Sequence, residues 1–161
     1  MGSYEKQLRI NSLRASIANW GNVNRQLINE NNKLNKENNK LEEEKKQYTS
    51  MINGINSAVG ELEAAIGAIN SANTVYSNNL KSSGAMAVSI GSSFSGASGE
   101  VSSVIGKLNG LIPEANNEIK EKENKIKKNK TTMTNNDKTI VQNSSNILRA
   151  NAEIAMLLAT L

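Results

Sequence analysis

The residues best suited to chemistry in this chain are lysines and glutamates that lie close together in the sequence. Six lysines lie between residues 120 and 130, where they alternate with Glu118, Glu121 and Glu123. A lysine cluster of this kind can bind phosphate groups. Here, however, acids at Glu37 and at residues 42–44 would lie opposite the lysines if the chain folded back on itself. Charge pairing within the chain is therefore the favoured interpretation.

Other catalytic or metal-binding chemistry is restricted by composition, because the sequence contains no cysteine and no histidine. Disulfides, thiolate metal sites, catalytic triads and histidine proton shuttles are thereby excluded. No glycine-rich phosphate loop, carboxylate dyad or metal-ligand spacing is present either. We expect no enzymatic activity, no cofactor and no metal, and the interleaved charges, with a net charge of +4, predict no nucleic-acid partner.

The elements that carry these charges are predicted by heptad repeats. Positions a and d recur at 3-4 spacing from Ile10 and Leu13 to Leu80, which predicts a helix over about residues 5–81. A second ladder of apolar residues at intervals of seven runs from Ile105 to Leu161 and predicts a return helix over about residues 85–160. Aromatic residues are too few to fill a wide globular core. The predicted fold is all-α, a long antiparallel two-helix hairpin of coiled-coil type that forms a single domain over residues 1–161.

Asparagines define the register of this hairpin. The chain has 26 of them, and both ladders contain consecutive polar seam positions. An antiparallel register in which paired residue numbers sum to 167 brings these positions together as Asn24 with Asn143, Asn31 with Asn136, Asn38 with Asn129, and Lys45 with Lys122. The amides would satisfy one another, whereas the lysines would have to turn outward to acids such as Glu42 or Glu121. Three explanations stay open for the asparagines: specification of register, a weak layer that admits another helix, and an asparagine-rich genome.

The predicted turn is Ser82-Ser83-Gly84, at the centre of the register. The glycine-rich and serine-rich residues that follow predict a segment loosened to about residue 99. Pro113 predicts either a helix restart or a kink in the return helix. The tip could be a plain connection, a docking end that exposes Val88, Ile90 and Phe94, or a membrane-inserting segment.

The overall pattern resembles small helical proteins of bacterial type VII secretion, related in style to the WXG type, and more closely the YwqH-like helical partners of LXG-domain toxins. Four features carry the resemblance: a charged coiled-coil helix from Leu13 to Ile69, a polar break from Tyr76 to Gly84, a start of the return helix rich in Ala, Ser and Gly from Ala85 to Gly106, and a C-terminal heptad region rich in Lys and Glu. Two motifs of such proteins are lacking, because Trp20-Gly21 are adjacent rather than a W-x-G turn and no Tyr-x-x-x-Asp/Glu tail follows Tyr76.

The resemblance implies a non-catalytic adaptor or targeting chaperone from a Gram-positive bacterium that packs beside the helical N-terminal domain of a secreted LXG toxin and promotes its export. A second small helical protein could supply the missing export signal. The implied location is the cytoplasm, or outside the cell together with the partner. We expect no cleavable signal peptide and no transmembrane helix. Two alternatives are a membrane-active protein that uses its tip and a structural homo-oligomeric coiled coil.

Apolar residues outside the seam are the candidates for contact with a partner. They are Ile28, Val75, Val88, Ile90, Phe94, Val104, Leu111, Val141, Leu148 and Leu158.

Overall fold

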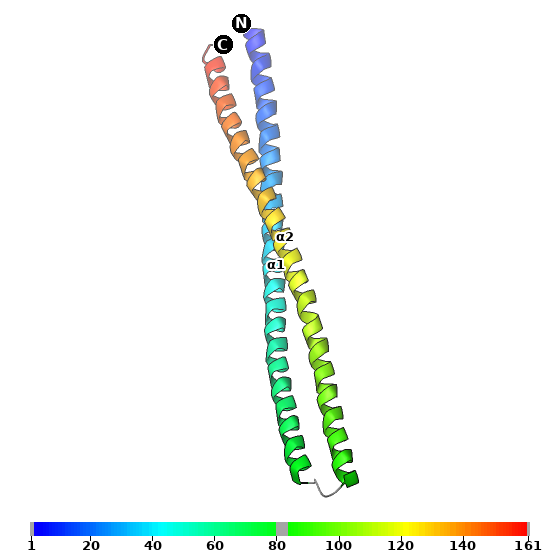
Figure 1. Ribbon diagram of the computed structural model, residues 1–161. Coiled ribbons are helices and arrows are strands. Elements are labelled where there is room, and N and C mark those ends of the chain that lie inside the picture. Colours follow the sequence, from blue (N-terminus) through cyan, green and yellow to red (C-terminus); the bar gives the residue numbers. More distant parts are fainter. Residues whose placement is uncertain (1, 80–83, 161) are drawn as a thin grey trace. The chain divides into compact units, whose positions relative to one another are not determined.

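Two long helices make up the protein in the computed structural model, which describes residues 2–79 and 84–160. Helix α1 spans Ser3–Asn79 and helix α2 spans Gly84–Leu158. The helices pack against each other as an antiparallel hairpin, so the prediction of an all-α helical hairpin is confirmed (Figure 1). Of the predicted turn, Ser82 and Ser83 lie outside the described residues, as does seam residue Leu80.

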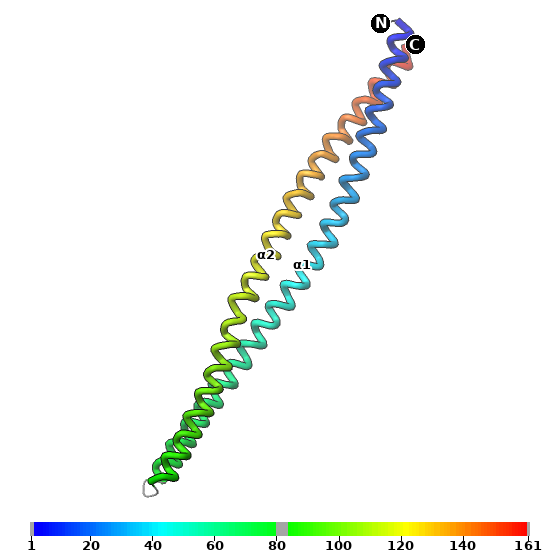
Figure 2. The backbone as a smooth tube through the Cα atoms, turned by 90° about the vertical axis from the view of Figure 1, so that its right-hand side faces the viewer, coloured from blue at the N-terminus to red at the C-terminus, as the bar shows by residue number. Residues whose placement is uncertain are grey.

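The hairpin divides into two compact units. The terminal unit comprises residues 1–41 and 123–161, and the central unit comprises residues 42–122. Within each unit, one segment of α1 runs beside one segment of α2, as the smooth tube of Figure 2 shows. Each unit therefore contains a stretch of the same heptad seam.

The core of the terminal unit lies near the chain ends. Ile10, Leu13, Ala150 and Ile154 are buried there, and Ile17, Trp20 and Leu157 pack against them. These residues form successive layers of the register in which paired numbers sum to 167. Trp20 accordingly contributes to the core, as the heptad pattern predicts.

The two ends of the chain, which lie in this unit, make polar contacts. The Gly2 N–H donates to Glu5 Oε2 (2.9 Å), which satisfies a donor that the first turn of α1 leaves free. At the C-terminal end of the chain, the carbonyl oxygen of Thr160 accepts a hydrogen bond from Lys6 Nζ (2.5 Å). A cation at the C-terminus of a helix is favourable, so α1 also stabilises the end of α2.

In the central unit the seam continues through the glycine-rich part of α2. Residues 85–99 are helical, so the loosening expected there does not occur in the backbone. Gly84 begins the helix with a φ of +20°, which glycine adopts without steric cost. The half-buried Gly91, Phe94 and Ser98 keep the 3-4 spacing of the seam. Packing against α1 therefore holds residues that have low helix propensity of their own.

Helix α2 also runs through Pro113 without a break in its helical assignment. A proline removes one backbone hydrogen bond, here to the carbonyl group of Asn109. Both residues are exposed, so water can take the place of that bond. The restart predicted at Pro113 is therefore not present.

The register predicts which cysteine pairs form disulfides. Asn31→Cys with Asn136→Cys should crosslink under mild oxidation, because the two native side chains are in direct contact in the structure. The crosslink is measured as a mobility shift on non-reducing gels. The control pair, Asn31→Cys with Ala150→Cys, should remain reduced, and its crosslinking in preference to the first pair would refute the register.

Candidate protein-binding surfaces

Three asparagine pairs cross the seam of the terminal unit. Asn143 Nδ2 donates to Asn24 Oδ1, Asn136 Nδ2 to Asn31 Oδ1, and Asn129 Nδ2 to Asn38 Oδ1, each at 2.9 Å. These are the pairs that the sum of 167 predicts. In every layer α2 supplies the donor and α1 the acceptor, so the three layers repeat one geometry.

Several of these amides also donate to acceptors outside the asparagine pairs. Asn129 Nδ2 donates a second bond to Glu37 Oε2 (3.0 Å), and Asn136 Nδ2 donates one to Glu30 Oε2 (3.2 Å). On α1, Asn31 Nδ2 donates to Asp137 Oδ1 (2.8 Å). No buried side-chain polar atom among the described residues lacks a partner. The asparagine layers are therefore satisfied within the hairpin and need no partner helix for their hydrogen bonds.

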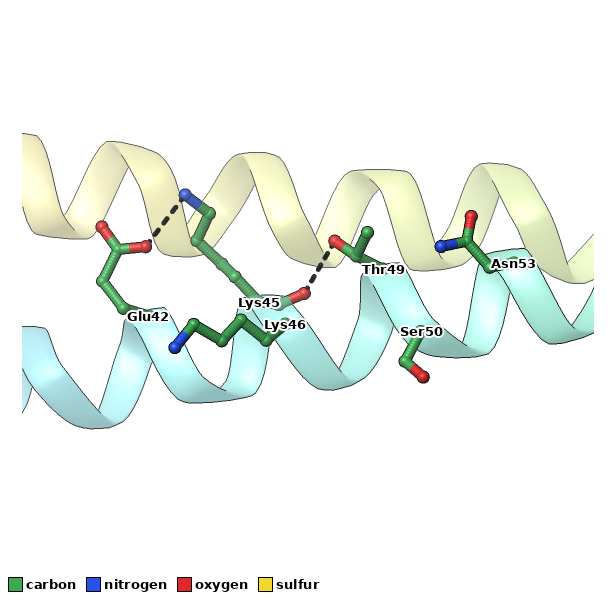
Figure 3. Close-up of a pocket in the computed structure, with 6 residues that line it drawn as sticks. All are labelled: Glu42, Lys45, Lys46, Thr49, Ser50 and Asn53. Atoms are coloured by element: carbon green, nitrogen blue, oxygen red, sulfur yellow. Dashed lines mark hydrogen bonds and ion pairs between the residues drawn. The ribbon is translucent and has the colours of Figure 1, made fainter.

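Lys45 and Lys122 form one layer of the seam in the central unit. They avoid like-charge repulsion because their side chains extend to different carboxylates. Lys45 extends to Glu42 (3.3 Å), as the close-up in Figure 3 shows. Lys122 extends instead to Glu118 (2.9 Å) and Glu44 (3.5 Å), and its ammonium group lies 5.1 Å from the centre of the Tyr48 ring. The sequence indicated Glu42 and Glu121 as possible partners of these lysines. Lys45 does pair with Glu42, but Lys122 pairs with Glu118 and Glu44 rather than with Glu121.

The environment of Lys122 favours its charged form. The hydrogen bond that Lys122 donates to Glu118 is the largest influence that raises the pKa of Lys122, and the nearby Tyr48 and Glu44 raise it further, whereas desolvation lowers it. The lysine therefore remains a cation although only 14% of its side chain is exposed. Sequence reasoning missed this site because Tyr48 had been treated only as a seam residue.

The flanks of the seam can be compared through heptad positions. With Ile10 as a in α1 and Ile105 as a in α2, positions e and b of both helices lie on one side of the seam, and g and c lie on the other. In an antiparallel pair, e residues of one helix lie beside e residues of the other, and g beside g. We call these sides the e flank and the g flank.

In the terminal unit the g flank is closed by polar contacts. Arg9 pairs with Glu153 (2.7 Å) and Glu37 pairs with Lys125 (2.7 Å). The bonds to Arg9 lower the pKa of Glu153, while Lys125 and then Asn129 lower the pKa of Glu37. The exposed apolar residues of this unit lie mainly on the e flank, at Ile28, Val141, Leu148 and Leu158.

In the central unit the g flank begins with Glu44 and Glu118, which pair with Lys122, and it is apolar beyond them. The apolar part consists of four facing pairs whose numbers sum to 162, and we call them together the apolar strip: Met51 with Leu111, Ala58 with Val104, Ala65 with Ala97, and Ala72 with Ile90. A groove of about 490 Å³ opens at the first pair. Its other lining residues are Tyr48, Glu114, Ala115, Asn117 and Glu118. The e flank of this unit carries a groove of about 410 Å³ with polar walls, including Lys46, Thr49 and Asn53 (Figure 3).

Most of the apolar residues expected to contact a partner are exposed. Eight of the ten are so: Ile28, Val75, Val88, Val104, Leu111, Val141, Leu148 and Leu158. Ile90 and Phe94 are instead half-buried, and the Phe94 ring stacks on Tyr76 with centroids 5.7 Å apart. The tip therefore does not present Phe94 as a free docking residue. The heptad register would have indicated this, because Phe94 is a d residue of α2.

Among the described residues, no cluster of carboxylates is arranged to hold a metal ion, and no helix is long and apolar enough to cross a membrane. Comparisons of the chain with protein families, with curated proteins and with solved structures find no match. The case for a function therefore rests on the surfaces described above.

The buried asparagine layer at Asn38 should be sensitive to one-sided substitution. Asn38→Ala removes one of the two acceptors of the buried Asn129 amide and leaves only its bond to Glu37, so the free energy of unfolding should fall by about 1–3 kcal/mol. The double variant Asn38→Leu with Asn129→Leu should instead be at least as stable as the wild type, since both amides are removed together. Urea unfolding followed by circular dichroism measures both, and a single variant as stable as the wild type would contradict the assignment.

The paired glutamates predict loss of stability in acid. Glu37 and Glu153 have lowered pKa values in the folded chain, so the unfolded chain binds protons first as the pH falls. The two glutamates contribute their full share of the folding stability above the ordinary pKa range of a glutamate. This contribution is lost as the pH falls through that range and below it. The urea midpoint should therefore decrease between neutral pH and strong acid, and less so in Glu153→Gln. Glu61→Gln is the control, and an equal effect of both substitutions would argue against the ion pair as the cause.

Proposed function

We propose that this protein is a non-catalytic helical adaptor that packs beside a helical domain of another protein. One observation carries the proposal. Among the described residues, fourteen large apolar side chains are exposed, whereas eight apolar side chains are buried. A two-helix hairpin can cover only one side of each helix, and additional helices complete such a bundle. Most of the exposed residues lie on the two flanks of the seam, where further helices would cover them.

The partner class that fits best is the helical N-terminal domain of a type VII secreted LXG toxin, as the sequence resemblance implies. The long continuous helices, Ser3–Asn79 and Gly84–Leu158, offer flanks along which an extended helical domain could lie. Binding there would shield apolar surface on both proteins before export. The chain would thus act as a targeting chaperone in the cytoplasm, or would leave the cell with its partner.

Two other functions receive less support from the surfaces. A membrane-inserting tip would be expected to use Val88, Ile90 and Phe94, but only Val88 of these is exposed, whereas Ile90 and Phe94 are half-buried in the hairpin. A homo-oligomeric coiled coil would use asparagines to set its oligomeric state, yet these amides bond across the hairpin itself.

Deletion of the gene in the native organism tests the proposal. We expect one large secreted protein with an N-terminal helical domain to fall severalfold in the culture medium and to be captured by the tagged chain. Quantitative mass spectrometry of medium and of captured material measures both effects.

Complementation should restore secretion with the wild-type gene but less well with a variant carrying Val104→Asp and Leu111→Asp. Secretion that is unchanged by the deletion would overturn the proposal. Normal levels of the complementing proteins in the cell lysate show that a loss is not caused by degradation.

A further inference from the structure

The apolar strip of the central unit differs from the other flanks in having neither ion pairs nor polar closure. Met51, Leu111 and Val104 are between 43% and 45% exposed, so each retains a large apolar surface toward solvent. The alanines Ala58, Ala65, Ala72 and Ala97 lie between the larger residues. Small side chains allow another helix to approach closely, and larger ones at the ends provide contact area.

The strip continues to the start of α2. At this end the c residues Val75 and Met86 are 57% and 59% exposed. The two residues face each other, because c residues that face each other in this register have numbers that sum to 161. At the other end, the groove beside Met51 and Leu111 has room for a large side chain between apolar residues and the polar Glu114, Asn117 and Glu118. Over its whole length, the strip therefore has the spacing of a helix-binding seam.

The borders of the strip are acidic. Glu61 on α1 and Glu100 on α2 occupy facing c positions, one on each side of the strip near its middle, and both are exposed. Neither has an ion-pair partner among the described residues. Farther along α2, the c residues Lys107 and Glu114 balance each other. The middle of the strip therefore carries two unpaired negative charges although the chain as a whole has a net charge of +4.

This charge distribution distinguishes between occupants. A second copy of the chain related by a two-fold axis through the middle of the strip would bring two more glutamates to the same place, which is unfavourable. A helix with lysine or arginine on both sides of an apolar stripe would instead pair with Glu61 and Glu100 together. Charges at such flanking positions commonly determine which helices associate.

We propose that the apolar strip between Met51/Leu111 and Val75/Met86 binds one amphipathic helix of a different protein, with basic residues on both sides of its apolar stripe facing Glu61 and Glu100. The inference rests on the proposed adaptor function and adds to it the surface and the chemistry of the partner helix.

Two synthetic helical peptides test the proposal without knowledge of the native partner. Both have the same leucine and alanine stripe over about four heptads, but one has lysine and the other glutamate at the flanking positions. Titration into the full-length chain is followed by fluorescence anisotropy at about 50 mM salt, where screening is weak. The lysine peptide should bind about tenfold more tightly than the glutamate peptide. Nonspecific attraction to a chain of net charge +4 would produce the opposite order.

Variants of the chain identify the surface. Glu61→Gln with Glu100→Gln should reduce the preference for lysine to about threefold or less, without loss of helicity. Val104→Asp should weaken both peptides, and Val141→Asp, the same change on the terminal unit, should weaken neither. Equal affinities of the peptides, absence of binding, or equal effects of the two aspartates would overturn the proposal.

Self-association provides the remaining outcome. If sedimentation shows a dimer of the wild type that Val104→Asp dissociates, a second copy covers the strip and the proposal is wrong. If neither peptide binds but a native toxin is still captured, the proposed binding surface is wrong while the adaptor function stands. Peptide binding combined with unchanged secretion in the deletion strain would instead reject the adaptor function and retain the surface.

Discussion

Hydrogen bonds between asparagines across the seam fix the register on which the other contacts depend. An amide pair such as Asn38 and Asn129 is satisfied only when the two residues face each other, whereas leucine layers tolerate a shift by one heptad. Once that register is set, Arg9 meets Glu153 and Glu37 meets Lys125 on the g flank. The asparagines thus contribute specificity, and the burial of isoleucine and leucine contributes most of the stability.

The same register explains how a like-charged layer can exist in the seam. Lys45 occupies an a position and reaches Glu42 on the e flank, while Lys122 occupies a d position and reaches Glu118 on the g flank. The two ammonium groups therefore turn to opposite sides. Tyr48 adds a ring face beside Lys122, so the charge that remains half-buried has both carboxylate and aromatic neighbours.

The two units differ in which flank is left apolar. Ion pairs close the g flank of the terminal unit, whereas the g flank of the central unit, beyond the carboxylates that pair with Lys122, consists of alanines and larger apolar residues around Val104 and Leu111. Exposed apolar surface favours association, so such a strip is not expected on a helix pair that remains surrounded by water. Its facing residues and acidic borders give the adaptor hypothesis a definite surface.

The sequence by itself determined the hairpin, its register and the three asparagine pairs, because heptad spacing places residues on one face of a helix regardless of what surrounds them. It did not determine the state of residues 85–99, where low helix propensity suggested loosening but packing against α1 maintains a helix. Nor did it show that Phe94 stacks on Tyr76 or that Lys122 selects Glu118 and Glu44. Such choices depend on side-chain positions across two helices, which only the tertiary structure decides.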